Sequence, residues 1–419
     1  MRKVLYVCHN HPSERPGGVE TYSVELYEAM RGARDFEPLL LAHRRRRGQS
    51  PTIAAVDEDP HQFFINTSDA AYDVFMGAAG DKRVVTRHYR DFLVAQQPDI
   101  VHFQHTLFLG YDLIRQTRTT LPHVPIVYTL HEFLPICHNN GQMVRTDDLA
   151  LCEESSPSRC HACFPDIGPA LFALRQRFVQ SHFSEVSMFF APSHFLRDRY
   201  VQWGIPENRI RYEEYGRSLS AVDDESDSRR VRNRFGFFGQ LSAFKGVNVL
   251  LEAMRLLKGD GRSDIHLSVH GANLESQPRA FQYEFRTLVD ATRETVTFAG
   301  RYDQTNVSQL IRAVDWVVVP SIWWENSPLV IQEAFAHGRP VICSGIGGMR
   351  EKVSHGVNGL HCEPADAHGL ADAIRQAASS TGLWEALRSG IPPIYRMDAH
   401  VQALVGTYRS LLHDSSSAH

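Results

Sequence analysis

The sequence predicts an α/β protein with two doubly wound parallel-sheet domains that face each other across a cleft. The chain has 419 residues, which is too long for one ordinary hydrophobic core. Short apolar runs recur along it, each followed by a loop and a helical pattern, and the series restarts once after a polar joint. Strands and helices that alternate in this way form parallel sheets covered by helices.

The first series of strands occupies the first half of the chain. The predicted strands are Val4–Cys8, Leu39–Ala42, Ile100–Phe103, Ile126–Leu130 and Met188–Ala191. Each run is apolar without alternation, which is typical of parallel strands buried on both faces. They predict an N-terminal domain at residues 1–217.

A polar joint and a second series follow. The stretch SLSAVDDESDSRR has no apolar periodicity and predicts a linker at residues 218–231. The strands after it are Phe235–Phe238, Ile265–Val269, Val296–Phe298, Trp316–Val319 and Val341–Cys343. They predict a C-terminal domain at residues 232–398, and in such sheets ligands bind outside the carboxyl ends of the strands.

The amino-acid composition favours some classes of protein over others. Hydrophobic residues make up 43% and charged residues 22%, as in a soluble globular protein. The net charge of −4 disfavours a nucleic-acid binder. The apolar run at the amino terminus is too short for a signal peptide, and no later run approaches the ~20 apolar residues that span a bilayer. We therefore expect a cytoplasmic protein with reduced cysteines.

Two glutamates flank the start of one predicted helix. Pro320 ends the strand Trp316–Val319, Ser327 can cap the next helix, and Pro328 suits its first position. The helix is expected to end near His337, before Gly338. Glu325 then lies in the loop, and Glu333 projects from the helix.

This arrangement fits a nucleotide-sugar. The backbone N–H groups at the helix start, including that of Leu329, favour a phosphate. Carboxylates on either side of it can accept hydrogen bonds from sugar hydroxyls. A surface loop acid and a salt-bridged helix acid are the alternative for any two glutamates taken alone.

The motif ENSPLVIQE, with AFAHGRPVICSGIGGMREKV and GVNGL after it, resembles the donor site of family 4 glycosyltransferases. Those enzymes are retaining and have the GT-B fold, two facing Rossmann-like domains. The resemblance implies that Glu333 holds the ribose hydroxyls and Glu325 the hydroxyls of the transferred sugar. It implies that the backbone at Asn326, Ser327, Pro328 and Leu329 meets the diphosphate. It also implies that a last helix, about residues 399–412, packs back on the first domain.

A second stretch, FFGQLSAFKGVNVLLEAM, is predicted to form a strand, a turn at Gly239 and a helix after Lys245-Gly246. Family members usually carry an arginine and a lysine here to neutralise the departing diphosphate. Lys245 matches the lysine, but Gln240 stands where the arginine is expected. Gln can donate a hydrogen bond but carries no charge. Taken alone, Lys245 would be read as a solvated surface lysine.

The first domain offers two further donor-side features. Gly17 and Gly18, in RPGGVE, permit a close backbone approach just before a helix and resemble the family's first loop, although a plain turn is the alternative. TLHE resembles a histidine motif of the family, so His131 is expected to contact the donor sugar near its anomeric centre. His102 and His105 are expected only to line the cleft. No GxxxxGK[ST] is present, which disfavours a P-loop NTPase.

Four of the seven cysteines fall in one polar segment. Cys137 and Cys152 precede a CxxC pair, Cys160 and Cys163, and four thiolates can bind zinc tetrahedrally. A structural zinc would order this long loop. Unliganded thiols or a redox pair are the alternatives.

A basic run, HRRRR, is predicted to lie in a loop after an early strand. Arg44–Arg47 could meet an anionic membrane or a lipid-diphosphate acceptor. A solvated charged loop is the alternative.

Together these features predict a cytosolic, retaining GT-B glycosyltransferase of polysaccharide biosynthesis. It would move a sugar from a nucleotide-sugar to a hydroxyl of a glycan or lipid-linked acceptor, with Glu325, His131 and Lys245 in the catalytic set. No metal cofactor is expected for the chemistry, because Lys245 and helix dipoles offset the diphosphate charge. A GT-B sugar-nucleotide epimerase is one alternative. A nucleotide-sugar binding subunit with weak turnover, which Gln240 makes possible, is another.

Overall fold

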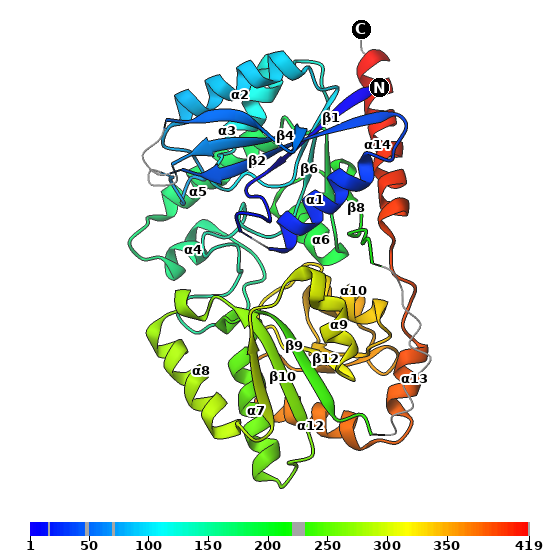
Figure 1. Cartoon of the computed structure of the whole chain (residues 1–419). Helices are drawn as coiled ribbons and strands as arrows, with labels where there is room; N and C mark the ends of the chain where they lie inside the picture. Colours follow the sequence, from blue (N-terminus) through cyan, green and yellow to red (C-terminus); the bar gives the residue numbers. More distant parts are fainter. Residues whose placement is uncertain (16, 47–49, 69–71, 220–230, 418–419) are drawn as a thin grey trace. The chain divides into compact units, whose positions relative to one another are not determined.

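The computed structural model describes residues 1–15, 17–46, 50–68, 72–219 and 231–417 (Figure 1). The chain divides into two compact units. Unit 1 comprises Met1–Ser218 and Tyr395–His419, and unit 2 comprises Leu219–Ile394. Most of the predicted linker, residues 220–230, lies outside the described residues.

Unit 1 is built on an eight-stranded sheet with the order β3-β4-β2-β1-β5-β6-β7-β8. All neighbours are parallel except β3 and β4. The strands are β1 (Arg2–Cys8), β2 (Phe36–Arg45), β3 (Thr52–Val56), β4 (Asp59–Thr67), β5 (Ile100–Phe103), β6 (Ile126–Thr129), β7 (Met188–Ala191) and β8 (Ile210–Tyr212). The helices are α1 (Gly18–Met30), α2 (Lys82–Gln96), α3 (Asp112–Thr120), α4 (Pro157–Cys163), α5 (Pro169–Phe183), α6 (His194–Trp203) and α14 (Met397–Ser417).

The five strands predicted for this unit are present, but β3, β4 and β8 were not predicted. Strand β3 lies at the edge of the sheet and is mostly exposed, so it has no continuous apolar run. The predicted basic loop is also wrong in part, because β2 continues to Arg45. Its pairing with β4 joins Arg44 to Asn66 and Arg45 to Thr67. Arg47 lies outside the described residues.

Helix α14 belongs to unit 1 although it is the last helix of the chain. It contacts α1 (Figure 1). Between these helices, Tyr22 Oη lies 2.7 Å from His400 Nε2. Tyr408, also on α14, is buried and its hydroxyl lies 2.6 Å from His102 Nδ1. These contacts attach the C-terminal segment to the sheet of the first unit.

Unit 2 is built on a six-stranded parallel sheet with the order β11-β10-β9-β12-β13-β14. The strands are β9 (Arg234–Gln240), β10 (His266–Ala272), β11 (Val296–Gly300), β12 (Trp316–Val319), β13 (Val341–Ser344) and β14 (Gly359–Cys362). The helices are α7 (Val247–Gly259), α8 (Arg279–Thr292), α9 (Val307–Arg312), α10 (Leu329–Ala336), α11 (Gly347–Lys352), α12 (Ala367–Ser379) and α13 (Leu383–Ser389). The five predicted strands are present, and only the short edge strand β14 was not predicted. Gly239 lies within β9, so the predicted turn there is wrong, and the chain turns after Gln240.

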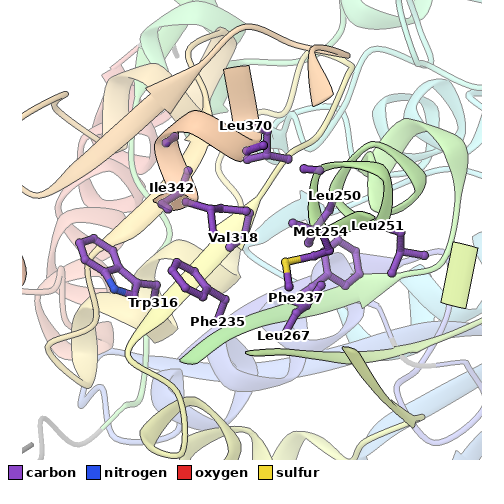
Figure 2. Close-up of a cluster of buried hydrophobic side chains, with 14 of the residues drawn as sticks. Phe235, Phe237, Leu250, Leu251, Met254, Leu267, Trp316, Val318, Ile342 and Leu370 are labelled. Carbon is purple, nitrogen blue, oxygen red and sulfur yellow. The ribbon is translucent and has the colours of Figure 1, made fainter. Parts of the chain in front are cut away.

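The core of unit 2 explains why its strands are apolar without alternation. Trp316 and Val318 face one cluster, in which side chains of β9 pack against α7 and α12 (Figure 2). Val317 and Val319 face a second cluster on the other side of the sheet. Because helices cover both faces, every residue of β12 is buried.

Candidate functional site

Both sheets have a point at which the strand order reverses. In unit 1 it lies between β1 and β5, and in unit 2 between β9 and β12. The loops that leave these neighbouring strands run to opposite sides, which opens a crevice at the carboxyl edge where ligands of such sheets bind. The predicted site residues of each unit follow these strands.

In unit 2, Lys245 follows β9 and Glu325 follows β12. Lys245 Nζ lies 2.6 Å from Glu325 Oε1. The same oxygen accepts hydrogen bonds from Ser321 Oγ at 2.7 Å and from Trp323 Nε1 at 2.9 Å. The side chain of Glu325 is buried, so this ion pair fixes the carboxylate at the switch point. Lys245 is therefore no solvated surface lysine.

Backbone contacts hold the two loops against each other. Ile322 N–H donates to Phe244 O at 2.9 Å. Gly246 has φ +69°, and a Cβ there would lie 1.9 Å from the carbonyl oxygen of Pro320. The chain after Lys245 thus contacts the loop after β12 at a distance that only glycine permits.

The glycine-rich loop after β13 holds the backbone of Glu325 in place. Gly348 N–H donates to Glu325 O at 2.7 Å. A Cβ on Gly348 would lie 1.4 Å from Asn326 O. In this part of the motif, glycine serves a close approach of two protein backbones.

Helix α10 begins one residue later than predicted. It starts at Leu329, and Pro328 (φ −59°, ψ 119°) takes the N-cap position that was predicted for Ser327. The extended ψ of Pro328 keeps it outside the helix. Helix α10 ends at Ala336, and Gly338 has φ +61°, so the predicted end is off by one residue.

Glu333 lies in the second turn of α10, and its side chain is buried. Burial raises the pKa of Tyr302, and the negative charge of Glu333 raises it further, which places the two side chains near each other. The ring of Tyr302 lies edge-on to Phe238, and Phe238 stacks on His270 with ring centroids 4.8 Å apart.

Sequence reasoning missed Phe238, His270 and Tyr302 as possible site residues. Phe238 and His270 lie near the carboxyl ends of β9 and β10, and Tyr302 follows β11. The signal was available, because these are the strand ends at which ligands bind. An aromatic group of this kind can stack on a planar ring. Gln240 is the last residue of β9 and its side chain is exposed, so it lies at the same edge.

In unit 1, Gly17 is the N-cap of α1 and Gly18 its first residue, and a loop joins β1 to this helix. Glu20, in the first turn of α1, pairs with His9, with Oε1 and Nε2 3.1 Å apart. Burial alone would raise the pKa of Glu20, but the hydrogen bond and charge of His9 outweigh it and lower that pKa. Burial, and then the charge of His105, lower the pKa of His9, and the hydrogen bond and charge of Glu20 offset part of this shift.

His105 extends this cluster across the sheet edge. Its ring lies 4.3 Å from that of His9, and its Nε2 lies 3.1 Å from Glu132 Oε1. His9 follows β1, His105 follows β5 and Glu132 follows β6, so three neighbouring strand ends bring these groups together. His9, Glu20 and Glu132 were not predicted as site residues.

His131 follows β6, and both its ring nitrogens have partners. Nδ1 lies 2.6 Å from Tyr215 Oη, and Nε2 lies 3.0 Å from Gln104 Oε1. Burial, and then the charges of neighbouring imidazoles, hold the pKa of His131 well below its ordinary value. His131 is therefore neutral at neutral pH. His102, expected to line the cleft, is fully buried and bonded to Tyr408 and Thr129, so that prediction is wrong.

The four clustered cysteines line one small cavity beside α4. Burial raises the pKa of Cys137 to about 11 and also raises the pKa values of Cys152 and Cys160. No group of three or more described His, Cys, Asp and Glu side chains is arranged to hold a metal ion.

Arg44 is engaged within unit 1. Its Nε donates to Asn66 Oδ1 at 2.9 Å, and its guanidinium lies 4.2 Å from the centre of the Phe64 ring. Arg46 reaches Glu14 at 4.0 Å. Among the described residues, no helix is both long and apolar enough to cross a membrane.

Two family models of glycosyltransferases match this chain, one in each half. Residues 16–212 match the family model described as Glycosyltransferase Family 4, and residues 232–380 match the model described as Glycosyl transferases group 1. Together the two models cover most of the chain.

Relatives and solved structures extend over nearly the whole chain. A glycogen synthase of Mycobacterium tuberculosis is 25% identical, over 89% of this chain and 85% of that protein. A D-inositol 3-phosphate glycosyltransferase of Jonesia denitrificans is 24% identical, over 93% and 90%. The structure of Anabaena HepE in complex with UDP and glucose is 18% identical, with a TM-score of 0.66 over 98% of this chain and all of that one.

The identity to HepE is too low to carry function, but the likeness shows the fold. The predicted GT-B fold is confirmed, with one Rossmann-like sheet in each unit. The matches of both halves and the full-length relatives establish the family. This chain belongs to the family 4, group 1 glycosyltransferases, enzymes that take a sugar from a nucleotide-sugar donor.

Proposed function

We propose that this enzyme is a retaining glycosyltransferase whose donor is a nucleotide-sugar, with UDP-sugars as the first candidates. The observation that carries the proposal is the ion pair between the half-buried Lys245 and the buried Glu325 at the switch point of unit 2, with Glu333 eight residues further on. HepE, which shares this fold, was solved with UDP and glucose, so UDP is the first nucleotide to test. The acceptor is a hydroxyl of a glycan or lipid-linked molecule.

Each group has a distinct task in this proposal. Glu333 accepts hydrogen bonds from the ribose hydroxyls, and the ring of Tyr302 beside it offers a surface for the base. The diphosphate meets the backbone at Asn326–Leu329 and the amino end of α10, where the helix dipole favours an anion. The exposed Gln240 can donate a hydrogen bond to the same group.

Lys245 links the donor diphosphate to the sugar-binding carboxylate. Its ammonium group lies against Glu325 and can share its charge with a diphosphate bound beside it. Glu325 keeps hydrogen bonds from Ser321 and Trp323 when Lys245 turns, so the carboxylate stays oriented towards the sugar hydroxyls. No metal ion is needed for this neutralisation.

The reaction breaks the bond between the anomeric carbon and the diphosphate oxygen. A bond to the acceptor oxygen forms on the same face of the sugar, and the leaving phosphate takes the acceptor proton. His131, Gly17 and Gly18 are the donor-side residues of unit 1. Because both ring nitrogens of His131 already have partners, we assign it a positioning role and not the role of the base.

A membrane contact through Arg44–Arg46 would bring the enzyme to a lipid-linked acceptor. The contacts of Arg44 with Asn66 and Phe64 reduce what it can offer a lipid surface. Arg45 is exposed and is the residue best placed to contribute.

Two variants test the division of the donor site. Glu333→Gln should weaken UDP binding by about 1.5–3 kcal/mol, because a charged hydrogen bond to ribose is lost. Glu325→Gln should leave UDP affinity nearly unchanged and lower the single-turnover rate, because its contact tightens as charge develops on the sugar. Calorimetry with UDP and single-turnover kinetics with a UDP-sugar measure the two effects.

Glu363→Gln, which changes an exposed carboxylate of the same unit, is the matched control. Thermal unfolding checks that each variant folds. Equal losses of UDP affinity in both variants would contradict the division of roles. Turnover of the donor without any acceptor would favour an epimerase, and binding without turnover would favour a binding subunit.

A further inference from the structure

The segment that joins β6 to the helices of unit 1 contains an unusual loop. Residues 130–156 contain no helix and no extended strand, and only an isolated bridge pairs Val144 with Leu151. Loops of this length are uncommon in compact domains unless they serve a function or are held by something besides secondary structure. The backbone also adopts positive φ at Met143 and Leu149, a conformation that such side chains rarely take.

Four cysteines meet in this segment. Cys137 and Cys152 come from the loop, and Cys160 and Cys163 from α4, yet all four line the same cavity of about 20 Å³. A space of this size accommodates a single water or ion. None of the four is in a disulfide bond. We propose that these four cysteines bind one structural zinc ion that fastens the loop to α4.

The surroundings suit a closed, thiolate-bound site. Met143 and Val144 are buried in the wall of the cavity, and Phe164 adds an aromatic ring. An apolar wall keeps water from the bound metal. Zinc takes four thiolates at about 2.3 Å in a tetrahedron, and such a site needs no further ligand.

Positive charge lies beside the cysteines. Zinc with four thiolates carries a net negative charge, which nearby guanidinium groups can offset. Arg145 and Arg159 act on the charge of Cys152, and Arg175 acts on that of Cys160. Arg175 donates to the carbonyls of Leu134, Pro135 and Phe75, so it also holds the start of the loop.

The four sulfur atoms must draw together for this site to form. In the present side-chain positions no described group of three or more possible ligands converges on one point. Cys152 Sγ instead donates to Glu154 O at 3.1 Å. A cysteine side chain turns about a single bond, so the proposal requires rotation of these thiols as the ion enters.

The site goes beyond the glycosyl transfer proposed above. The cysteines belong to unit 1, whereas Lys245, Glu325 and Glu333 belong to unit 2. Removal of the metal should therefore loosen the loop while UDP binding by unit 2 persists. The two proposals can fail independently.

The test uses the full chain, purified with a reducing agent and without added metal. Elemental analysis should find near-stoichiometric zinc, and the double variant Cys160→Ser/Cys163→Ser should lose it. Cys362→Ser, which changes a thiol of unit 2, is the matched control and should keep the metal. Zinc that persists in the double variant would overturn the assignment.

A second measurement covers the case in which the double variant does not fold. The wild-type protein is stripped of metal with a chelator and titrated with Co²⁺ alone, which reports thiolate ligands through sulfur-to-cobalt charge-transfer absorption. That absorption should saturate, and limited proteolysis within residues 130–156 should be faster in the stripped protein. No metal in fresh reduced protein together with no such absorption, or a disulfide among the four cysteines, would overturn the proposal.

Discussion

Units 1 and 2 are both built on a sheet whose strand order reverses once, but the side chains at the carboxyl edges of the two sheets differ in their chemistry. At the edge of unit 2, a lysine and a buried carboxylate form an ion pair, with Glu333 nearby. At the edge of unit 1, His9 pairs with Glu20, His105 pairs with Glu132, and His131 is hydrogen-bonded to uncharged partners. The topology determines where a ligand binds, and the side chains at the strand ends determine which ligand. In the function proposed above, the edge of unit 2 binds the anionic diphosphate of the donor.

The largest expected effect concerns Lys245, the cation at the edge of unit 2. Lys245→Ala should lower kcat by about 10²–10³-fold, because it removes a charge aimed at the leaving group. Steady-state kinetics with a UDP-sugar measure the loss. Lys258→Ala, which breaks a surface pair with Glu294 in the same unit, should leave kcat near wild type. Equal kcat values in the two variants would mean that the charge of Lys245 makes no special contribution to catalysis at the edge of unit 2.

The glycines of the two edges should differ in their tolerance of a methyl group. Gly348→Ala should lower the free energy of unfolding by about 3 kcal/mol, because its Cβ would meet the backbone carbonyl of Asn326. Gly17→Ala should cost less, about 1–2 kcal/mol, because the nearest atoms to its Cβ belong to the Glu20 side chain, which can shift at the expense of its pair with His9. Denaturant unfolding compares them.

Gly259→Ala, where a Cβ would meet nothing within 4 Å, is the control for the glycine pair and should not destabilise the chain. If Gly17→Ala and Gly348→Ala cost the same, then the two glycine loops serve the same packing role. A marked loss in the control would show that chain flexibility, and not close approach, governs all three positions.

A buried histidine of unit 1 should make this unit sensitive to acid. Burial lowers the pKa of His102 from 6.5 to about 3. Between these values the unfolded chain binds a proton that the folded chain does not, so stability is full above pH 6.5 and falls as the pH is lowered. His102→Gln should flatten this dependence while costing about 1–3 kcal/mol at neutral pH for the buried hydrogen bonds.

Unfolding midpoints measured from pH 7.5 to 4.5 test the histidine prediction. His123→Gln, at an exposed position of unit 1, is the control and should keep the slope of the parent protein. An unchanged slope in His102→Gln would assign the acid sensitivity to other groups of the chain.

The smallest expected effect concerns the arginines at the end of β2. Arg45→Ser/Arg46→Ser should weaken binding to anionic vesicles by about 1 kcal/mol per charge that lies near the surface. Arg44→Ser should add little, because that guanidinium already contacts Asn66 and Phe64. Vesicle co-sedimentation at low salt measures the binding. If the parent protein does not bind the vesicles, the membrane proposal is wrong and these arginines are only solvated charges at the edge of unit 1.

Local pattern in the sequence was enough for several features. Apolar runs such as Trp316–Val319 predicted strands with the observed bounds, because burial on both faces requires apolar residues at every position. The spacing of Glu325 and Glu333 located one glutamate in the loop and the other in the second turn of the helix. The grouping of four cysteines in one segment predicted that they lie together, and they line one cavity.

Contacts between distant residues were decided only by the tertiary structure. Lys245 meets Glu325 across 80 residues, because β9 and β12 are neighbours in the sheet. Arg44 belongs to a strand because β4 pairs with β2, and no pattern within HRRRR encodes that partner. His131 is neutral because burial and its partners Gln104 and Tyr215 make it so. Local periodicity records which residues are buried, whereas strand order and register, which no single segment contains, determine what each buried group touches.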